Sequence, residues 1–189
     1  MNNRNLPVFV LACGISFFFS GPVHSAPGPQ QARGQRDDSR MGGSLIREVR
    51  HQLVMLPYYS VFDNLTYSVE GDTVMLNGQV TRPTIKSDAE SAVKSIEGVG
   101  RVLNNIEVLP LSPMDDDIRR SVYRAVYGDS GLQRYAVQAV PSIHIIVKNG
   151  HVALEGVADT EGDKNMANLR ASGVPNVFSV KNNLVVSSK

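Results

Sequence analysis

The sequence has almost no cysteine, and Cys13 is the only one in 189 residues. It lies in an apolar run near the N-terminus, so removal of that run would leave a chain without any thiol. Such a chain has no disulfide, no thiol catalysis and no cysteine-ligated metal. The stretch Val10 to Cys13 faintly resembles a lipoprotein site. A lipidated Cys13 would have only a short apolar segment before it, so we do not predict an outer-membrane lipoprotein.

The chain also lacks an excess of charge of either sign. Its formal net charge is +1, and 42% of its residues are hydrophobic and 20% charged. These values are ordinary for a globular protein. A nucleic-acid-binding protein usually carries a strongly basic surface, so the composition gives no reason to expect a nucleic-acid partner.

No apolar run is long enough for a typical membrane span. The charge-free run from Leu6 to Phe19 falls short of the roughly 20 residues that cross a bilayer. It follows Arg4 and precedes the small residues Val23, Ser25 and Ala26, which is the pattern of a secretory signal peptide. We predict cleavage after Ser25, giving a signal peptide over residues 1–25 and a periplasmic protein. The alternatives are cleavage after Ala26 and retention as a membrane anchor.

Catalytic patterns are missing as well. No serine lies in a strand-elbow glycine pattern, and the sequence has no phosphate-cradling glycine loop. His51, His144 and His151 lack the spacing of metal ligands and are predicted to be surface side chains. The acidic run Asp115 to Asp117 fits the first turn of a helix, where carboxylates complement the helix dipole. We therefore predict a protein that is not an enzyme, with no metal, no cofactor and no small-molecule substrate.

Residues 26–43 are rich in Pro, Gly, Gln and Arg, with almost no large apolar side chains. Such a segment cannot bury enough surface to offset its ordering entropy, and it is predicted to be a flexible linker. Residues 44–189 are left for folded structure.

The chain contains one module twice. The stretch VMLNGQV (74–80) matches VALEGVA (152–158) at an offset of 78 residues. The same offset places Leu65, Tyr67 and Val69 on Ile143, Ile145 and Val147, and it places the pair Asn104-Asn105 on Asn182-Asn183. Three separated blocks at one offset indicate an internal repeat. We predict domains over residues 44–110 and 114–189.

Each copy begins with a predicted helix followed by a hairpin. Ser44 is predicted to cap a helix through Leu56, whose apolar residues Leu45, Ile46, Val49, Leu53 and Leu56 are spaced three or four apart. Ser112 or Asp115 would cap its counterpart, in which Ile118, Val122 and Val126 share a face. Alternating apolar residues and the turns Gly71-Asp72 and Asn149-Gly150 predict two hairpins. Gly78 and Gly156 fall on the inward faces, where they would let a helix approach closely or permit a bend.

A second helix and a last strand complete each copy. Pro83 can start the helix of copy one, and Ile85, Ala89 and Ala92 lie on its inner face with Val93 and Ile96. Its counterpart near Thr160 to Ser172 is interpreted as three residues shorter. The last strands are predicted over 101–109 and 178–186. The fold class is therefore α+β: two α-β-β-α-β modules, each a three-stranded mixed sheet with two helices on one face.

These residues resemble the BON domain of bacterial envelope proteins, of the periplasmic osmotic-stress type. The matching elements in copy one are Gly71-Asp72, VMLNG (74–78), Gly98-Val99 with Val102, and NNIEV (104–108). Copy two has Asn149-Gly150, VALEG (152–156), Gly173-Val174 with Val177, and NNLVV (182–186), with three extra residues before the asparagine pair. The resemblance implies an envelope location and the binding of phospholipid or of envelope components. It carries over no individual site residue.

Two groups of residues are candidates for a binding surface. One is the apolar and aromatic segment around Tyr58 and Tyr59, which can equally close the core at the sheet edge. The other is Val174 to Phe178, including Val177, with Lys164, Arg170 and Lys181 near it in sequence. Exposed apolar residues beside basic ones suit a membrane surface with anionic headgroups.

The balance of charge favours the second copy for this role. Residues 44–110 carry six basic and eight acidic side chains, whereas residues 114–189 carry nine and eight. The predicted function is a non-catalytic envelope module that associates with anionic phospholipid, mainly through its second copy. The alternative is an adaptor that docks an envelope protein through a sheet edge or an aromatic patch.

Overall fold

The computed structural model describes residues 43–138 and 140–187, which belong to one compact unit. The predicted signal peptide, its Cys13 and linker residues 26–42 lie outside the described residues. Gly43 is already helical, so Ser44 is not the N-cap that the sequence suggested. Ile46, predicted to face inward, is 47% exposed.

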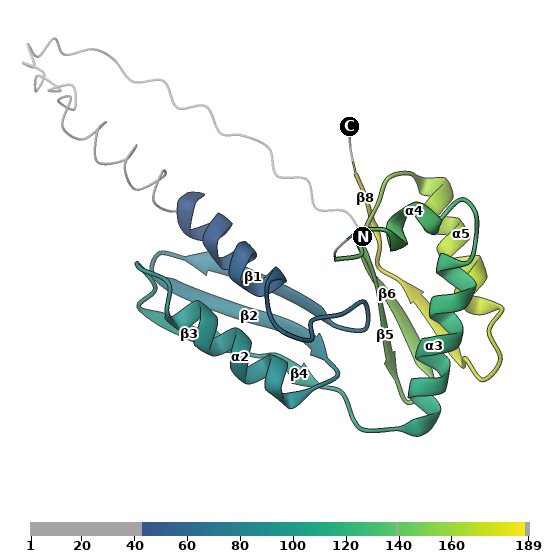
Figure 1. The fold of residues 1–189 in the computed structure, drawn as a ribbon, viewed down its shortest axis with the longest axis horizontal. Coiled ribbons are helices and arrows are strands. Elements are labelled where there is room, and N and C mark those ends of the chain that lie inside the picture. Colours follow the sequence, from purple (N-terminus) through teal and green to yellow (C-terminus); the bar gives the residue numbers. More distant parts are fainter. Residues whose placement is uncertain (1–42, 139, 188–189) are drawn as a thin grey trace, which may run out of the picture. The chain divides into compact units, whose positions relative to one another are not determined.

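The first module has the predicted order of elements (Figure 1). A helix that includes residues 43–54 precedes an antiparallel hairpin, and a second helix leads to strands that pair with β2 in parallel. Its elements are β1 (Asn64–Glu70), β2 (Thr73–Val80), α2 (Pro83–Lys94), β3 (Arg101–Asn104) and β4 (Glu107–Val108).

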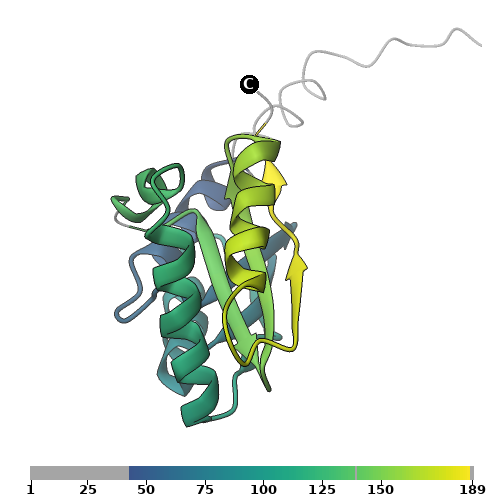
Figure 2. The same cartoon turned by 90° about the vertical axis from the view of Figure 1, so that its right-hand side faces the viewer.

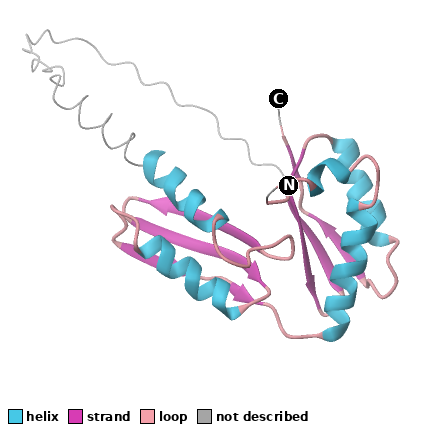
Figure 3. Ribbon diagram, in the orientation of Figure 1, coloured by secondary structure: helices cyan, strands magenta, loops and turns pink. Residues whose placement is uncertain are grey.

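The second module repeats this arrangement with one added helix. Figures 2 and 3 show α3 and α5 on the same face of its sheet. The sheet again has an antiparallel hairpin, and β6 pairs in parallel with the last two strands. Its elements are α3 (Pro113–Tyr127), α4 (Gln133–Ala136), β5 (Ile143–Lys148), β6 (His151–Ala158), α5 (Glu161–Ser172), β7 (Ser179–Asn182) and β8 (Val185–Val186).

The asparagine pair of each copy explains why the predicted third strand is interrupted. Asn104 donates its side-chain amide to Lys86 O at 3.0 Å, and its side-chain oxygen accepts from Ile106 N at 3.2 Å. Asn182 makes the same two bonds, to Lys164 O at 2.8 Å and from Leu184 N at 3.2 Å. The side chain thus satisfies a backbone N–H at the break and fastens the strand to the neighbouring helix, while Asn105 N still bonds Leu76 O at 2.8 Å.

The two copies have equal lengths from the first strand onward, which corrects one sequence prediction. Helices α2 and α5 both contain 12 residues, so the second is not shorter. The positive-φ partner of Gly98 (φ 91°) is Asn176 (φ 66°), 78 residues later, and not Gly173. Gly173 instead forms the C-cap of α5. The apparent three extra residues came from pairing the wrong glycine.

Gly78 and Gly156 are required by a close approach of strand backbones, not of a helix. Their φ angles are 123° and 106°, a region that L-residues with side chains rarely adopt. A Cβ atom at Gly78 would lie 1.9 Å from Asn64 O, and one at Gly156 would lie 2.1 Å from Ser142 O. The glycines therefore allow the local bend that the sequence suggested as one of two roles.

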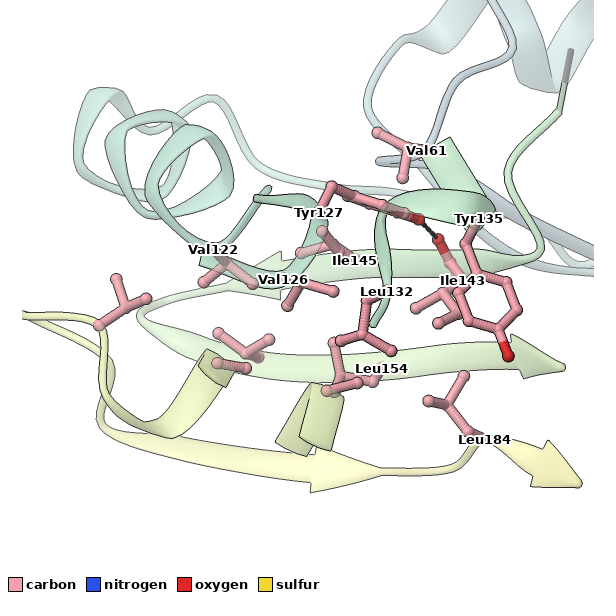
Figure 4. Packing of buried hydrophobic residues seen from close by; sticks show 14 of the residues in the cluster. Val61, Val122, Val126, Tyr127, Leu132, Tyr135, Ile143, Ile145, Leu154 and Leu184 are labelled. Carbon is pink, nitrogen blue, oxygen red and sulfur yellow. Dashed lines mark hydrogen bonds between the residues drawn. The ribbon is translucent and has the colours of Figure 1, made fainter. Parts of the chain in front are cut away.

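Each module buries its own hydrophobic cluster between helices and sheet. Val49, Leu76 and Ile85 are among the buried residues of the first, and Val122, Ile145 and Leu154 are among those of the second. Val61, from the segment that precedes β1, lies in the second cluster (Figure 4). Its carbonyl accepts from Ile145 N at 2.8 Å. This hydrogen bond therefore joins the edge strand β5 to a segment of the first module.

Candidate functional site

The basic residues chosen from the sequence do not form one surface. Lys164 and Arg170 lie on α5, whereas Lys181 lies on β7. The side chain of Asn182 bonds to α5, and adjacent strand residues point to opposite faces of a sheet, so Lys181 points away from the helices. The structure separates Lys181 from the two helical cations.

The apolar part of the same candidate surface is also divided. Val174 is buried and Val177 partly buried, so both belong mainly to the core. Phe178 is 66% exposed, and its ring contacts His151 with centroids 5.8 Å apart. A binding role for Val177 or Phe178 stays a prediction.

Arg170 takes part in a groove between α3 and the C-terminal end of α5. The groove has a volume of about 420 Å³. Two arginines, Arg124 from α3 and Arg170 from α5, line it beside Leu169 and Pro175. Leu169 is 65% exposed although it is a large apolar side chain. The full lining is Ser121, Arg124, Ala125, Leu169, Arg170, Gly173, Val174 and Pro175.

The two arginines of the groove differ in their partners. Arg170 forms an ion pair with Asp129 at 2.6 Å, and the hydrogen bond from Arg170 lowers the pKa of Asp129 below its usual range. Arg124 bonds the Ser121 hydroxyl at 3.3 Å and forms no ion pair with any described carboxylate. Arg120, one turn earlier on the same side of α3, adds a third cation near this surface. The α3 side of the groove is therefore positively charged beside exposed apolar groups.

Tyr58 and Tyr59 have different surroundings. Tyr58 is 69% exposed, with Arg82 stacked 4.8 Å from its ring centroid. Tyr59 is partly buried against the first core, and burial raises its pKa to about 12. Core closure thus describes Tyr59, and Tyr58 remains available at the surface. In the second copy the corresponding stretch closes the core through Leu132 and Tyr135.

The prediction that His144 is a surface side chain is wrong, because it is only 8% exposed. Its ring centroid lies 5.8 Å from that of Tyr59, and burial lowers its pKa. The backbone of Asp63 and Ser60 opposes this shift by hydrogen bonding. The alternation of apolar and polar residues in the second module could not reveal this burial, because the segment that covers His144 belongs to the first module. His51 and His151 are exposed, as predicted.

Two buried carboxylates were missed as individually important residues. Asp63 is fully buried and accepts four hydrogen bonds, from the backbone N–H and hydroxyl of both Ser60 and Thr81, at 2.7–3.0 Å. Asp115 is 1% exposed and accepts from Asn149 N and Gly150 N, each at 2.8 Å. Ser112 fills the N-cap role, as one of the two candidates. Asp115 therefore joins α3 to the hairpin turn, beyond its expected effect on the helix dipole.

Among the described residues, neither a cluster of metal-binding side chains nor a membrane-spanning helix is present. Among residues 43–138 and 140–187, no group of three or more His, Cys, Asp or Glu side chains is arranged to hold a metal ion. Within the same ranges no helix has both the length and the apolar character needed to cross a membrane.

Comparison with solved structures gives only a weak likeness. CdsD, a structural protein of the type III secretion system of Chlamydia trachomatis, is 14% identical, with 76% of this chain and 92% of that chain covered and a TM-score of 0.30. The C-terminal domain of CdsD is 13% identical, with 76% and 98% covered and a TM-score of 0.28. These TM-scores are too low to carry an argument about function. No curated protein matches the chain.

The family comparison covers most of the chain. The model of the BON domain matches residues 45–110 and again residues 115–188. The two matches coincide with the two structural modules and their separate cores. BON domains are generally non-catalytic and occur in envelope and periplasmic proteins. The chain therefore belongs to the BON domain family, with two BON domains in tandem.

Proposed function

We propose that this protein is exported to the periplasm and associates there with anionic phospholipid through the groove between α3 and α5 of its second BON domain. The observation that carries the proposal is Arg124, a cation without a carboxylate partner among the described residues, beside the exposed Leu169. An anionic headgroup can pair with the guanidinium while apolar groups enter the outer layer of the bilayer. Signal-peptide cleavage and an osmotic-stress role are parts of the same proposal.

The energetics suit reversible rather than permanent attachment. Each basic side chain near an anionic membrane surface contributes about 1 kcal/mol. Arg124, Arg120 and Arg170 together would give weak binding, because Asp117 and Asp129 already pair with two of them. Salt should reduce this binding strongly, since charges at a surface are screened within about 8 Å at physiological ionic strength.

Sedimentation of residues 26–189 with vesicles tests the proposal. We expect co-pelleting with phosphatidylglycerol-containing vesicles at low salt, little with neutral phosphatidylcholine vesicles, and loss as salt rises. Arg124→Glu should weaken binding roughly ten-fold or more, because it reverses a charge at the surface. Arg47→Glu makes the same change on an exposed position of the first domain and should alter binding by less than about two-fold. Equal losses in both variants would contradict a site in the second domain.

A second function, docking of an envelope protein, is favoured by the exposed aromatic rings of Tyr58 and Phe178. Binding through these rings should survive high salt and should be lost with Tyr58→Ala or Phe178→Ala. A chain that pellets with no vesicle at any salt concentration would rule out the lipid proposal and leave this function, to be tested by cross-linking.

A further inference from the structure

A second cavity lies where the segment before β1 meets the first turns of α3. Its volume is about 440 Å³, slightly more than that of the α3–α5 groove, and the two share no lining residue. Its lining is Tyr58, Ser60, Phe62, Thr81, Arg82, Leu109, Pro110, Leu111, Asp116, Arg119 and Arg120. The cavity thus combines arginines with aromatic and apolar side chains.

The lining has an excess of positive charge. Three arginines, Arg82, Arg119 and Arg120, face a single carboxylate, that of Asp116. Arg120 pairs with Asp117, but both side chains are more than 60% exposed, so water screens the pair and an incoming anion can replace it. Arg82 forms no ion pair with a described carboxylate and lies over the ring of Tyr58. Two cations are therefore available at the mouth.

Arg119 supplies a buried charge behind them. Its side chain is 6% exposed, and its guanidinium donates to Val147 O at 2.7 Å and pairs with Asp116 at 2.5 Å. Its Nε makes no hydrogen bond to any described group. A buried guanidinium with an unused donor and one half-exposed counterion creates a positive potential in the cavity beside it. This charge favours an anion without needing to touch it.

The backbone at the mouth is held in an unusual conformation. Tyr58 has a φ of 66°, in the left-handed region that non-glycine residues seldom occupy. Such a conformation costs free energy and persists where the surrounding structure imposes it, often at a binding site. Here it accompanies an exposed ring that carries Arg82. Leu111, 95% exposed, adds an apolar group to the rim.

We propose that this cavity binds a phosphate group, with Arg82 and Arg120 as its direct ligands and Arg119 as the buried source of potential. Arginine suits this role because its planar fork gives two parallel hydrogen bonds to phosphate oxygens. The phosphate belongs either to a free ion or ester or to a phospholipid headgroup whose apolar part contacts Tyr58 and Leu111. The inference does not depend on the lipid-binding role of the α3–α5 groove, because Arg124 and Arg170, which line the groove, lie outside this cavity. Arg120 belongs to this cavity and also lies near the groove surface.

The first arm of the test uses inorganic phosphate. Sodium phosphate is titrated into ¹⁵N-labelled residues 26–189 at constant ionic strength, and amide and arginine side-chain shifts are followed by NMR. We expect saturable shifts centred on Arg82 and Arg120. Arg82→Gln and Arg120→Gln should each weaken binding roughly ten-fold, the effect of one charge-assisted hydrogen bond. Arg47→Gln is the matched control and should leave phosphate affinity within about two-fold, because Arg47 is an exposed residue outside this lining.

The second arm uses dihexanoyl phosphatidylglycerol below its micelle concentration. Tighter binding than that of inorganic phosphate, lost in the same two variants, identifies a lipid headgroup as the source. Equal or weaker binding identifies a free phosphate compound. Shifts that rise linearly and spread over all surface arginines in both arms would overturn the proposal. So would unchanged affinity in the Arg82→Gln, Arg120→Gln double variant, provided that its thermal unfolding matches the parent chain.

The outcome is independent of the vesicle experiment. Loss of vesicle binding with Arg124→Glu but not with Arg82→Gln would support the α3–α5 groove and say nothing against phosphate in this cavity. Phosphate binding without vesicle binding would reject the lipid proposal and keep the present one.

Discussion

The two BON domains have equal lengths from the first strand to the last. They differ in length in the segment between the first helix and the first strand. Val49 and Val122 occupy equivalent buried helix positions 73 residues apart, whereas Leu65 and Ile143 on the first strands are 78 apart. The second domain therefore has five more residues between its first helix and its first strand. The sheet and second helix tolerate little change, and the entry segment is where the copies diverged.

The longer segment of the second domain closes its own core. It forms α4, and Tyr135 packs in the core while its hydroxyl accepts from Asp159 N at 2.8 Å and donates to Asp163 at 3.0 Å. The shorter segment of the first domain instead contributes Val61 to the other domain and forms part of the cavity with Arg119. The difference in length of this segment is therefore accompanied by a difference in packing. The longer segment packs into the core of its own domain, and the shorter one contributes Val61 to the core of the other domain.

The largest effect is expected at Gly78 and Gly156, which occupy equivalent positions in the two domains. Gly78→Ala and Gly156→Ala each place a Cβ against strand backbone at a φ unfavourable for alanine, so each should cost about 3 kcal/mol or more of unfolding free energy. Urea unfolding with residue-resolved hydrogen exchange should assign each loss to its own domain. Gly162→Ala, within α5, is the control and should raise stability by up to about 1 kcal/mol. If either variant leaves the unfolding free energy unchanged, the two glycines do not have equivalent structural roles.

A smaller effect is expected at Asp115, which bonds the hairpin turn of the second domain. Asp115→Asn replaces a buried acceptor of two backbone N–H groups with an amide that can serve only one of them well, and should cost about 2 kcal/mol. Asp117→Asn removes an exposed carboxylate two residues later and should change stability by less than about 0.5 kcal/mol. Similar losses in the two variants, measured by urea unfolding, would show that the bond to the hairpin turn is unimportant.

The smallest expected effect is a pH dependence at the contact between the segment and β5. Burial lowers the pKa of folded His144, so between its folded value and the ordinary value of 6.5 the unfolded chain binds more protons. Stability is therefore full above about pH 6.5 and falls as pH decreases through the lowered folded value. Tyr59, Asp63 and Glu155 are the titratable groups that act near this ring.

His144→Gln should flatten this part of the pH profile in thermal unfolding. His151→Gln is the control, because His151 is exposed and bonds only the Ser179 hydroxyl among its described polar neighbours. An equal pH profile in the parent chain and in His144→Gln would show that protonation of this ring does not affect the contact.

Much of each domain could be predicted because the signals are local. Alternation on the hairpin strands, the turn at Asn149-Gly150 and Pro83 at a helix start depend on near neighbours in sequence. The candidate site was predicted less well. Arg170 was selected, but Arg124 was not, because residues on α3 and α5 meet only after the helices pack on the sheet.

The sequence by itself determined the repeat, the α+β class and the order of the elements that the two modules share, because apolar periodicity and turn residues act within each module. Tertiary structure decided the partners of isolated polar residues. The burial of His144, the role of Asp115 and the grouping of Arg82, Arg119 and Arg120 all depend on segments far apart in the chain. No periodic sequence pattern predicts such long-range contacts. The sequence around a single polar residue does not indicate whether its hydrogen-bond partner is water or a distant backbone group.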